Sequence, residues 1–180
     1  MRGLGLASVG KGDAAAHLRP TSDRVRESIF NLLQNGGYGD PVEGARVLDR
    51  FAGTGALGIV ALSRGAEGCV FVDSGRAAGG LVAENIERAR VAESVRVIAR
   101  DAQRLGVASE APATLVFLDP PYGKGLGARA LVTVAEGGWL GAGALVVWEE
   151  ATEQDAPEGF TKLDARRYGE TWVTILEFEG

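Results

Sequence analysis

Cysteine and histidine are almost absent from this chain, whose 180 residues include one of each, Cys69 and His17. A single cysteine cannot form a disulfide within the chain, and one cysteine with one histidine cannot assemble a Cys/His zinc site. We therefore expect no metal ion, and a buried, reduced thiol is the simplest interpretation of Cys69. Reduced cysteine is typical of the cytoplasm, which is the expected location.

Long apolar runs are absent as well. No uninterrupted apolar stretch approaches the roughly 20 residues needed to cross a bilayer, and residues 1–11 lack the apolar segment of a signal peptide. Hydrophobic residues still make up 46% of the chain, which is enough for a sizeable core. We expect a soluble monomer without membrane contacts, with an N-terminal arm over residues 1–20 and a single domain over residues 21–180.

A strong positive charge is also missing, since the net charge is −5. This value argues against a protein that coats nucleic acid by bulk electrostatic attraction. The first 36 residues carry a small excess of basic side chains. That excess allows contacts with phosphates but does not by itself identify an RNA-binding protein.

From residue 45 onward, short apolar runs alternate with amphipathic stretches. Strands are predicted at Ala45–Leu48, Cys69–Val72, Val95–Ala99, Leu115–Leu118 and Leu145–Trp148. Helices are predicted from Ser22 to the Gly36-Gly37 pair, near Ala56–Ser63, and over about Arg76–Arg90. Phe160–Arg167 and Thr171–Phe178 flank a turn and predict a hairpin. This order predicts an α/β fold, with a parallel, doubly wound sheet closed by a C-terminal β-hairpin.

A glycine-rich loop follows the first predicted strand. Gly53, Gly55 and Gly58 satisfy the pattern G-x-G-x-x-G between a strand and a helix. Asp73 follows about 20 residues after the first glycine, at the end of the next strand. Glycines let the backbone turn tightly and approach a ligand closely. Asp73 is expected to accept hydrogen bonds from ribose hydroxyls, so the segment fits either NAD or S-adenosylmethionine.

Asp49, just before the loop, favours one of these two cofactors. A carboxylate there repels a pyrophosphate but suits the cationic amino-acid end of S-adenosylmethionine. We therefore favour S-adenosylmethionine, while an NAD enzyme and a tight turn without a ligand stay open. Asp101 follows the third predicted strand and is expected to accept a hydrogen bond from the adenine amino group.

The tetrapeptide Asp119-Pro120-Pro121-Tyr122 follows the fourth predicted strand. Prolines lack N–H groups, so the carbonyls near them are available as acceptors. Asp119 and the carbonyl of Pro120 can each accept one N–H of an amino group on a base, and Tyr122 offers a face on which a base stacks. The pattern favours methyl transfer to an exocyclic amino group.

These motifs resemble a known group of proteins. Asp119-Pro120-Pro121-Tyr122 with Asp49-x-Phe51-x-Gly53-x-Gly55 looks like the amino-methyltransferases of the class I fold. Residues 18–31, 51–58 and 61–66 are similar to the RsmD family, bacterial enzymes that methylate the N2 amino group of a guanine in small-subunit rRNA. The resemblance implies a Rossmann-like, seven-stranded, mostly parallel sheet with an antiparallel C-terminal hairpin. It also implies that a flipped guanine binds at Asp119–Tyr122.

The motifs and the resemblance together assign three sets of residues. The catalytic set is Asp119, Pro120, Pro121 and Tyr122. The set expected to bind S-adenosylmethionine is Asp49, Phe51, Ala52, Gly53, Thr54, Gly55, Asp73, Asp101 and Ala102. The set expected to contact ribosomal RNA or a small-subunit assembly particle is Arg19, Thr21, Arg24 and Arg26.

Two departures from the family pattern leave alternatives open. Arg50 stands where the family has an apolar residue, and residues 1–17 lack the basic hairpin that usually opens it. A non-catalytic nucleotide-binding module therefore stays open, as does a DNA adenine-N6 methyltransferase, which uses the same chemistry. Asn85 lies within a predicted helix and is expected to be exposed or a cap rather than part of the site.

Overall fold

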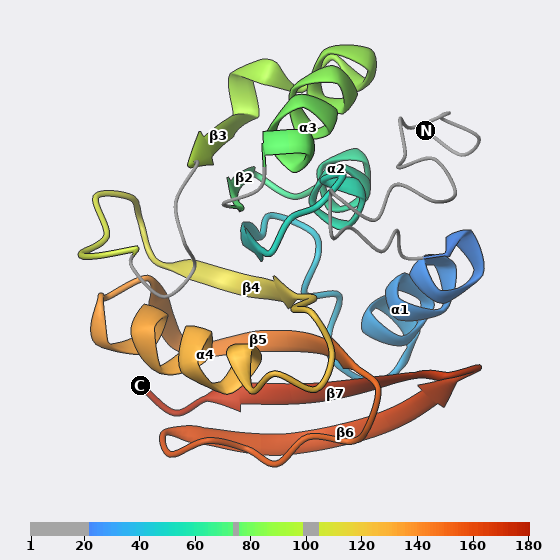
Figure 1. The fold of residues 1–180 in the computed structure, drawn as a ribbon, viewed down its shortest axis with the longest axis vertical. Helices are drawn as coiled ribbons and strands as arrows, with labels where there is room; N and C mark the ends of the chain where they lie inside the picture. Colours follow the sequence, from blue (N-terminus) through green and yellow to red (C-terminus); the bar gives the residue numbers. More distant parts are fainter. Residues whose placement is uncertain (1–21, 74–75, 99–104) are drawn as a thin grey trace.

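The computed structural model describes residues 22–73, 76–98 and 105–180, which form one sheet with helices on both faces (Figure 1). The described strands are β1 (Arg46–Arg50), β2 (Gly68–Val72), β3 (Val95–Ile98), β4 (Ala113–Leu118), β5 (Leu140–Glu150), β6 (Phe160–Tyr168) and β7 (Thr171–Phe178). The described helices are α1 (Asp23–Asn35), α2 (Ala56–Ser63), α3 (Arg76–Ala89) and α4 (Leu126–Glu136), with a 3₁₀ turn η2 (Ala92–Ser94).

The strands lie in the order β3-β2-β1-β4-β5-β7-β6. Neighbours from β3 to β5 are parallel, whereas β7 is antiparallel to both β5 and β6. This arrangement confirms the predicted sheet and its C-terminal hairpin. After β3 the chain returns to the other side of β1, where β4 pairs with it. Open α/β sheets bind ligands at the carboxyl ends of the strands beside such a reversal.

Two apolar clusters fill the two faces of the sheet. Buried residues of α1, α2 and α3 belong to the first cluster, and those of α4 belong to the second. Side chains alternate between these faces along β1, so Val47 lies in the first cluster and Leu48 in the second. In the first cluster the rings of Phe30 and Phe117 lie 5.6 Å apart, which joins α1 to β4.

The first helix begins and ends where the sequence predicts. The Ser22 hydroxyl accepts a hydrogen bond of 3.2 Å from the amide of Val25 and satisfies one unpaired N–H of the first turn. At the other end the amide of Gly36 donates to the carbonyl of Leu32 at 2.8 Å. The helix start predicted at Ser22 and the stop predicted at Gly36 are both confirmed.

Three parts of the fold differ from the prediction. No helix is predicted at α4, although its buried residues follow helical spacing: Gly127, Ala130, Leu131 and Val134. β5 begins at Leu140 rather than Leu145. Its first half is mostly glycine and alanine, which do not give the apolar pattern of a strand. β1 extends to Arg50, so Asp49 and Arg50 belong to the strand itself rather than to the loop.

Candidate active site

The glycine loop leaves β1 at the carboxyl edge of the sheet. Phe51, Gly53 and Gly55 have φ angles of 58°, 59° and 75°, in the left-handed region that glycine adopts without strain. The amide of Ala52 donates to the Val72 carbonyl at 3.1 Å, and the amide of Gly55 donates back to Ala52 at 2.8 Å. The loop is therefore a tight turn tied to the neighbouring strand, with one non-glycine residue, Phe51, in a strained conformation.

Gly58, the third glycine of the pattern, lets α2 pack closely on β2. A Cβ atom on Gly58 would lie 2.5 Å from the ring of Phe71 and 2.7 Å from the sulfur of Cys69. Both distances are far inside van der Waals contact, and both neighbours are buried. The glycine is required because helix and strand approach each other too closely for any side chain.

Asp49 lies beneath the loop rather than within it. Its side chain is 2% exposed, and Oδ2 accepts a hydrogen bond of 3.1 Å from the amide of Gly58. Burial raises the pKa of Asp49 well above its usual range; the Gly58 amide lowers it, and the carboxylates of Asp119 and Asp73 raise it further. The carboxyl ends of β1, β2 and β4 thus bring three acidic side chains within electrostatic reach of one another.

Asp73 follows β2 and contacts the glycine loop directly. Its Oδ2 accepts a hydrogen bond of 3.0 Å from the amide of Gly53, and its own amide donates to the Ile98 carbonyl at 3.2 Å. Asp73 therefore helps to hold the loop in shape, besides the ribose contact predicted from the sequence. That ribose contact stays a prediction.

Asn85 is buried, which corrects the expectation of an exposed or capping residue. Its side chain is 0% exposed in α3, and Nδ2 donates a hydrogen bond of 2.7 Å to the carbonyl of Thr54. A buried amide must find such partners. The sequence holds a signal for it, because Asn85 lies on the same helical stripe as buried Val82, Ile86 and Ala89.

The Asp119–Tyr122 loop lies next to the glycine loop, because β4 pairs with β1 in parallel register up to Leu118 and Arg50. The amide of Asp119 donates to the Arg50 carbonyl at 3.5 Å. Pro120 is buried, whereas Asp119, Pro121 and Tyr122 are half-buried. The two predicted motifs therefore meet at one edge of the sheet.

Two partners from later in the chain hold the end of this loop. The Tyr122 hydroxyl lies 3.3 Å from the hydroxyl of Thr171, and the amide of Gly123 donates to Oε1 of Glu150 at 3.0 Å. Sequence reasoning missed Glu150 and Thr171, because they lie 27 and 49 residues away from their partners. No local pattern identifies either residue.

Arg50 is fully buried at 0% exposure. Side chains alternate along a strand, so Arg50 lies on the face opposite to Asp49, on the side of α4. Arg50, which departs from the family pattern, therefore does not lie on the face where α2 and Asp49 pack.

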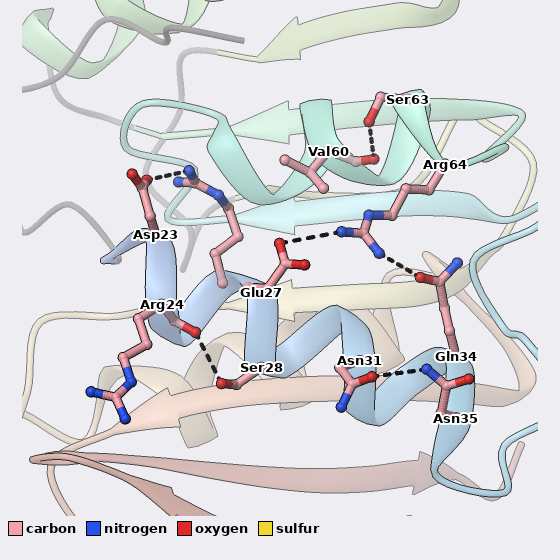
Figure 2. Close-up of polar contacts among 11 residues, drawn as sticks. Asp23, Arg24, Glu27, Ser28, Asn31, Gln34, Asn35, Val60, Ser63 and Arg64 are labelled. Atoms are coloured by element: carbon pink, nitrogen blue, oxygen red, sulfur yellow. Dashed lines mark hydrogen bonds and ion pairs between the residues drawn. The ribbon is translucent and has the colours of Figure 1, made fainter. Parts of the chain in front are cut away.

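Arg64, at the end of α2, contacts α1 in three ways. Its Nη1 donates to Oε1 of Gln34 at 2.6 Å, its Nη2 lies 3.5 Å from Oε2 of Glu27, and its guanidinium carbon lies 5.0 Å from the centre of the Phe30 ring. Figure 2 shows both polar contacts. The planar fork of arginine makes several directed contacts at once. Arg64 therefore fixes α1 to the helix that begins at the glycine loop.

The predicted RNA-binding arginines of α1 have different surroundings. Arg26 forms an ion pair with Asp23, and its side chain is 18% exposed. Arg24 is exposed and points away from Arg64 in Figure 2. Four further predicted site residues lie outside the described residues: Arg19, Thr21, Asp101 and Ala102.

The described residues contain no cluster of three or more His, Cys, Asp and Glu side chains suited to a metal ion. Among the same residues, no helix combines the length and the apolar character needed to cross a membrane.

Comparison with known proteins identifies the family. A family model described as "Conserved hypothetical protein 95" matches residues 8–177. Ribosomal RNA small subunit methyltransferase D of Escherichia coli (strain K12) is 36% identical over 140 residues, 78% of this chain and 68% of that protein. The solved structure of the Escherichia coli protein yhhF has a TM-score of 0.77 at 32% identity, over 91% of this chain and 89% of that one.

A more distant structure shares the fold. The RNA methyltransferase from Salinibacter ruber, solved in complex with S-adenosyl-L-homocysteine, has a TM-score of 0.68 at 18% identity, over 89% of this chain and 94% of that one. The family match covers most of the chain and agrees with the resemblance to the RsmD family. The chain belongs to the family described as Conserved hypothetical protein 95.

Proposed function

We propose that the protein transfers a methyl group from S-adenosylmethionine to the exocyclic N2 amino group of a guanine in small-subunit rRNA. The observation that carries this proposal is the position of two loops side by side. The glycine loop and the Asp119–Tyr122 loop leave adjacent parallel strands at the same edge of the sheet. One loop suits a methyl donor and the other suits an amino group. Family membership and the named Escherichia coli relative support a ribosomal substrate.

The chemistry of the glycine loop fits S-adenosylmethionine. Gly53 and Gly55 adopt positive φ angles that favour glycine, so the turn is tight and carries no side chain at either position. Asp49 and Asp73 supply carboxyl groups that suit the cationic amino-acid end and the ribose hydroxyls, and that repel a pyrophosphate. A nearby cation favours the ionised form of Asp49 against its burial. When bound, S-adenosylmethionine supplies an electrophilic methyl group. Phe51, Ala52 and Thr54 line the same turn, and Asp101 and Ala102 complete the proposed cofactor set.

The Asp119–Tyr122 loop suits the amino group of a base. The lone pair of such a nitrogen is delocalised into the ring, so the nitrogen is a weak nucleophile. The Asp119 carboxylate and the Pro120 carbonyl each accept one N–H, which holds the nitrogen and directs its lone pair toward the methyl group. Asp119 need not be a strong base, because the methylated amine loses a proton readily. Tyr122 stacks on a base swung out of the RNA, and catalysis comes mainly from positioning.

The RNA itself is proposed to cross α1. Arg24 is exposed near the start of this helix, which makes it a better phosphate contact than Arg26, whose charge is paired with Asp23. Arg19 and Thr21 belong to the same proposed contact. We also propose that the protein acts as a cytoplasmic monomer.

The first part of the test measures cofactor choice and transfer with the wild-type protein. Calorimetric titration with S-adenosylhomocysteine and, in parallel, with NAD should give binding of the first alone. Transfer from methyl-labelled S-adenosylmethionine should label small-subunit rRNA, offered both as naked RNA and in assembly particles. Binding of NAD alone would contradict the methyltransferase assignment.

The second part uses Asp119→Ala. This variant should abolish transfer and leave the affinity for S-adenosylhomocysteine within a few-fold of wild type, because Asp119 contacts the acceptor rather than the donor. Asp155→Ala is a matched control, since that carboxylate is fully exposed and 3.8 Å from Lys162 Nζ. Unchanged turnover in Asp119→Ala would refute the proposed contact with the amino group.

A further inference from the structure

The end of the Asp119–Tyr122 loop is held by groups that come from the C-terminal part of the sheet. Tyr122 makes a contact of 3.3 Å between its hydroxyl and that of Thr171, the first residue of β7. The next residue, Gly123, donates its amide to the carboxylate of Glu150, the last residue of β5, at 3.0 Å. Two consecutive residues of the loop therefore have partners on two different strands.

Both partners lie at the same end of the sheet. Glu150 pairs with Trp172 in the register of β5 and β7, and Thr171 directly precedes Trp172. Thr171 also pairs with Tyr168 where β6 turns into β7. The tip of the C-terminal hairpin thus stands beside the end of β5, and together they form a support behind the loop.

Hydrogen bonds, rather than packing in the apolar core, account for the buried position of Glu150. Its side chain is 6% exposed, and Oε1 accepts hydrogen bonds from two amides, Gly123 at 3.0 Å and Ala151 at 3.3 Å. Burying a carboxylate is costly unless hydrogen bonds compensate for lost water. Gly123 has a φ of 74°, so the backbone turns sharply at the point where the carboxylate holds it. Glu150 therefore fixes the turn immediately after Tyr122.

Thr171 restrains the hydroxyl end of the Tyr122 side chain. A tyrosine ring anchored only through its Cα can still change its side-chain torsions. A hydrogen bond at the hydroxyl, the atom farthest from the backbone, limits that motion. Stacking of a base depends on the direction of the ring face, and small errors in placement reduce rates strongly in reactions that rely on positioning.

We infer that Thr171 and Glu150 are positioning residues that orient the Tyr122 ring for the target base. This inference rests on the proposed function and adds the C-terminal hairpin to the site. It assigns these two residues no contact with the cofactor, whose proposed loop follows β1. Their loss should therefore reduce methyl transfer without changing cofactor affinity.

The first test compares Thr171→Val with Thr171→Ser. Valine keeps the shape and removes the hydroxyl, whereas serine keeps the hydroxyl and removes a methyl group. Thr171→Val should lower kcat for RNA methylation about threefold to tenfold, the effect of one neutral hydrogen bond. Its affinity for S-adenosylhomocysteine should match that of wild type, and its melting temperature should fall by only about 1–6 °C, the loss of one hydrogen bond. Thr171→Ser should retain near-normal turnover.

A double-mutant cycle with Tyr122→Phe isolates the contact. Phenylalanine keeps the stacking face and removes the hydroxyl that meets Thr171. If the contact acts as inferred, Thr171→Val lowers turnover in the wild-type background and has no further effect in Tyr122→Phe. Equal losses in both backgrounds would overturn the inference, because Thr171 would then act through something other than Tyr122.

The second test addresses Glu150 with Glu150→Gln and Glu150→Ala. Glutamine keeps an oxygen acceptor, so the Gly123 amide should remain protected from hydrogen exchange and turnover should stay near normal. Alanine removes the acceptor, so exchange at Gly123 and loss of turnover should rise together. If Glu150→Ala folds poorly, the comparison of Thr171→Val with Thr171→Ser still tests the inference. An active wild type with a fully active Thr171→Val overturns this inference alone, whereas a wild type that transfers no methyl group overturns the proposed function with it.

Discussion

The side-chain amide of Asn85, in α3, donates a hydrogen bond of 2.7 Å to the carbonyl oxygen of Thr54 in the glycine loop. The contact joins a buried residue to the segment proposed to bind the methyl donor. Asn85→Leu keeps the volume of the side chain and removes the donor. The Thr54 carbonyl then loses this hydrogen bond, which should lower the free energy of unfolding by about 1–3 kcal/mol.

The expected result for Asn85→Leu is a lower free energy of unfolding and weaker binding of S-adenosylhomocysteine. Chemical denaturation and calorimetry measure the two quantities. Asn35→Ala is the matched control, because Asn35 makes an exposed contact with Asn31 and should change neither quantity. Wild-type cofactor affinity in Asn85→Leu would show that the contact does not shape the loop.

Gly58→Ala should destabilise the protein although alanine usually favours a helix. The helix preference of alanine over glycine is worth about 1 kcal/mol. The new Cβ would lie 2.5 Å from the buried Phe71 ring, and overpacking of this kind typically costs about 1–3 kcal/mol. The clash is expected to prevail, because Phe71 is 0% exposed and has no room to move.

Thermal unfolding of Gly58→Ala should show a lower midpoint than that of Gly141→Ala. At Gly141 the nearest atom to a new Cβ is the Ala113 carbonyl oxygen at 3.5 Å, an ordinary contact. A variant at position 58 that is as stable as wild type would mean that α2 can shift away from β2 without loss.

Asp49 should make stability depend on pH. Burial raises the pKa of this carboxyl in the folded protein, although the Gly58 amide partly opposes the shift. In the unfolded chain the pKa is about 3.9. Below that pH the group is protonated in both states and has no effect. As pH rises toward the folded pKa, the unfolded state loses its proton first, so the folded state is progressively disfavoured.

Asp49→Asn removes this dependence and keeps an oxygen that accepts from Gly58. The free energy of unfolding of Asp49→Asn minus that of wild type should therefore grow as pH increases from about 4 to neutrality. Denaturant unfolding at several pH values measures the difference. A difference that stays constant over this range would contradict the raised pKa.

Arg24→Ala should weaken RNA binding and reduce its dependence on salt. Loss of one phosphate contact should lower the slope of log affinity against log salt by about 0.7–0.9. Arg129→Ala is a matched control, because Arg129 is also an exposed helical arginine but lies on α4, on the opposite face of the sheet. Equal salt slopes for wild type and Arg24→Ala would remove Arg24 from the proposed RNA contact.

Local patterns were sufficient to predict that two motif-bearing loops lie at one edge of the sheet. A glycine loop and an acid–proline–aromatic motif each follow an apolar strand, and parallel strands bring their carboxyl ends to one edge. The structure adds the pairing of β1 with β4, which makes the two loops neighbours at that edge. The RsmD resemblance, confirmed by the family match, rests on the glycine loop together with residues 18–31 and 61–66.

The contacts that support the loops could not be predicted in this way. Arg64 reaches Gln34 across 30 residues, and Thr171 reaches Tyr122 across 49. Such contacts depend on how helices pack and how far the hairpin extends, which no local spacing encodes. Asn85 is a different case. Its helical spacing from Val82, Ile86 and Ala89 indicates a buried position, but its polar side chain favoured the expectation of an exposed one.

The nucleoside produced in the reaction tests the central claim most directly. The protein is incubated with S-adenosylmethionine and small-subunit rRNA, as naked RNA and in assembly particles, and the RNA is digested and analysed by mass spectrometry. The account predicts N2-methylguanosine, absent when Asp119→Ala replaces the wild type. A methylated nucleoside other than N2-methylguanosine as the sole product, or no methylated nucleoside with either form of rRNA, would contradict it.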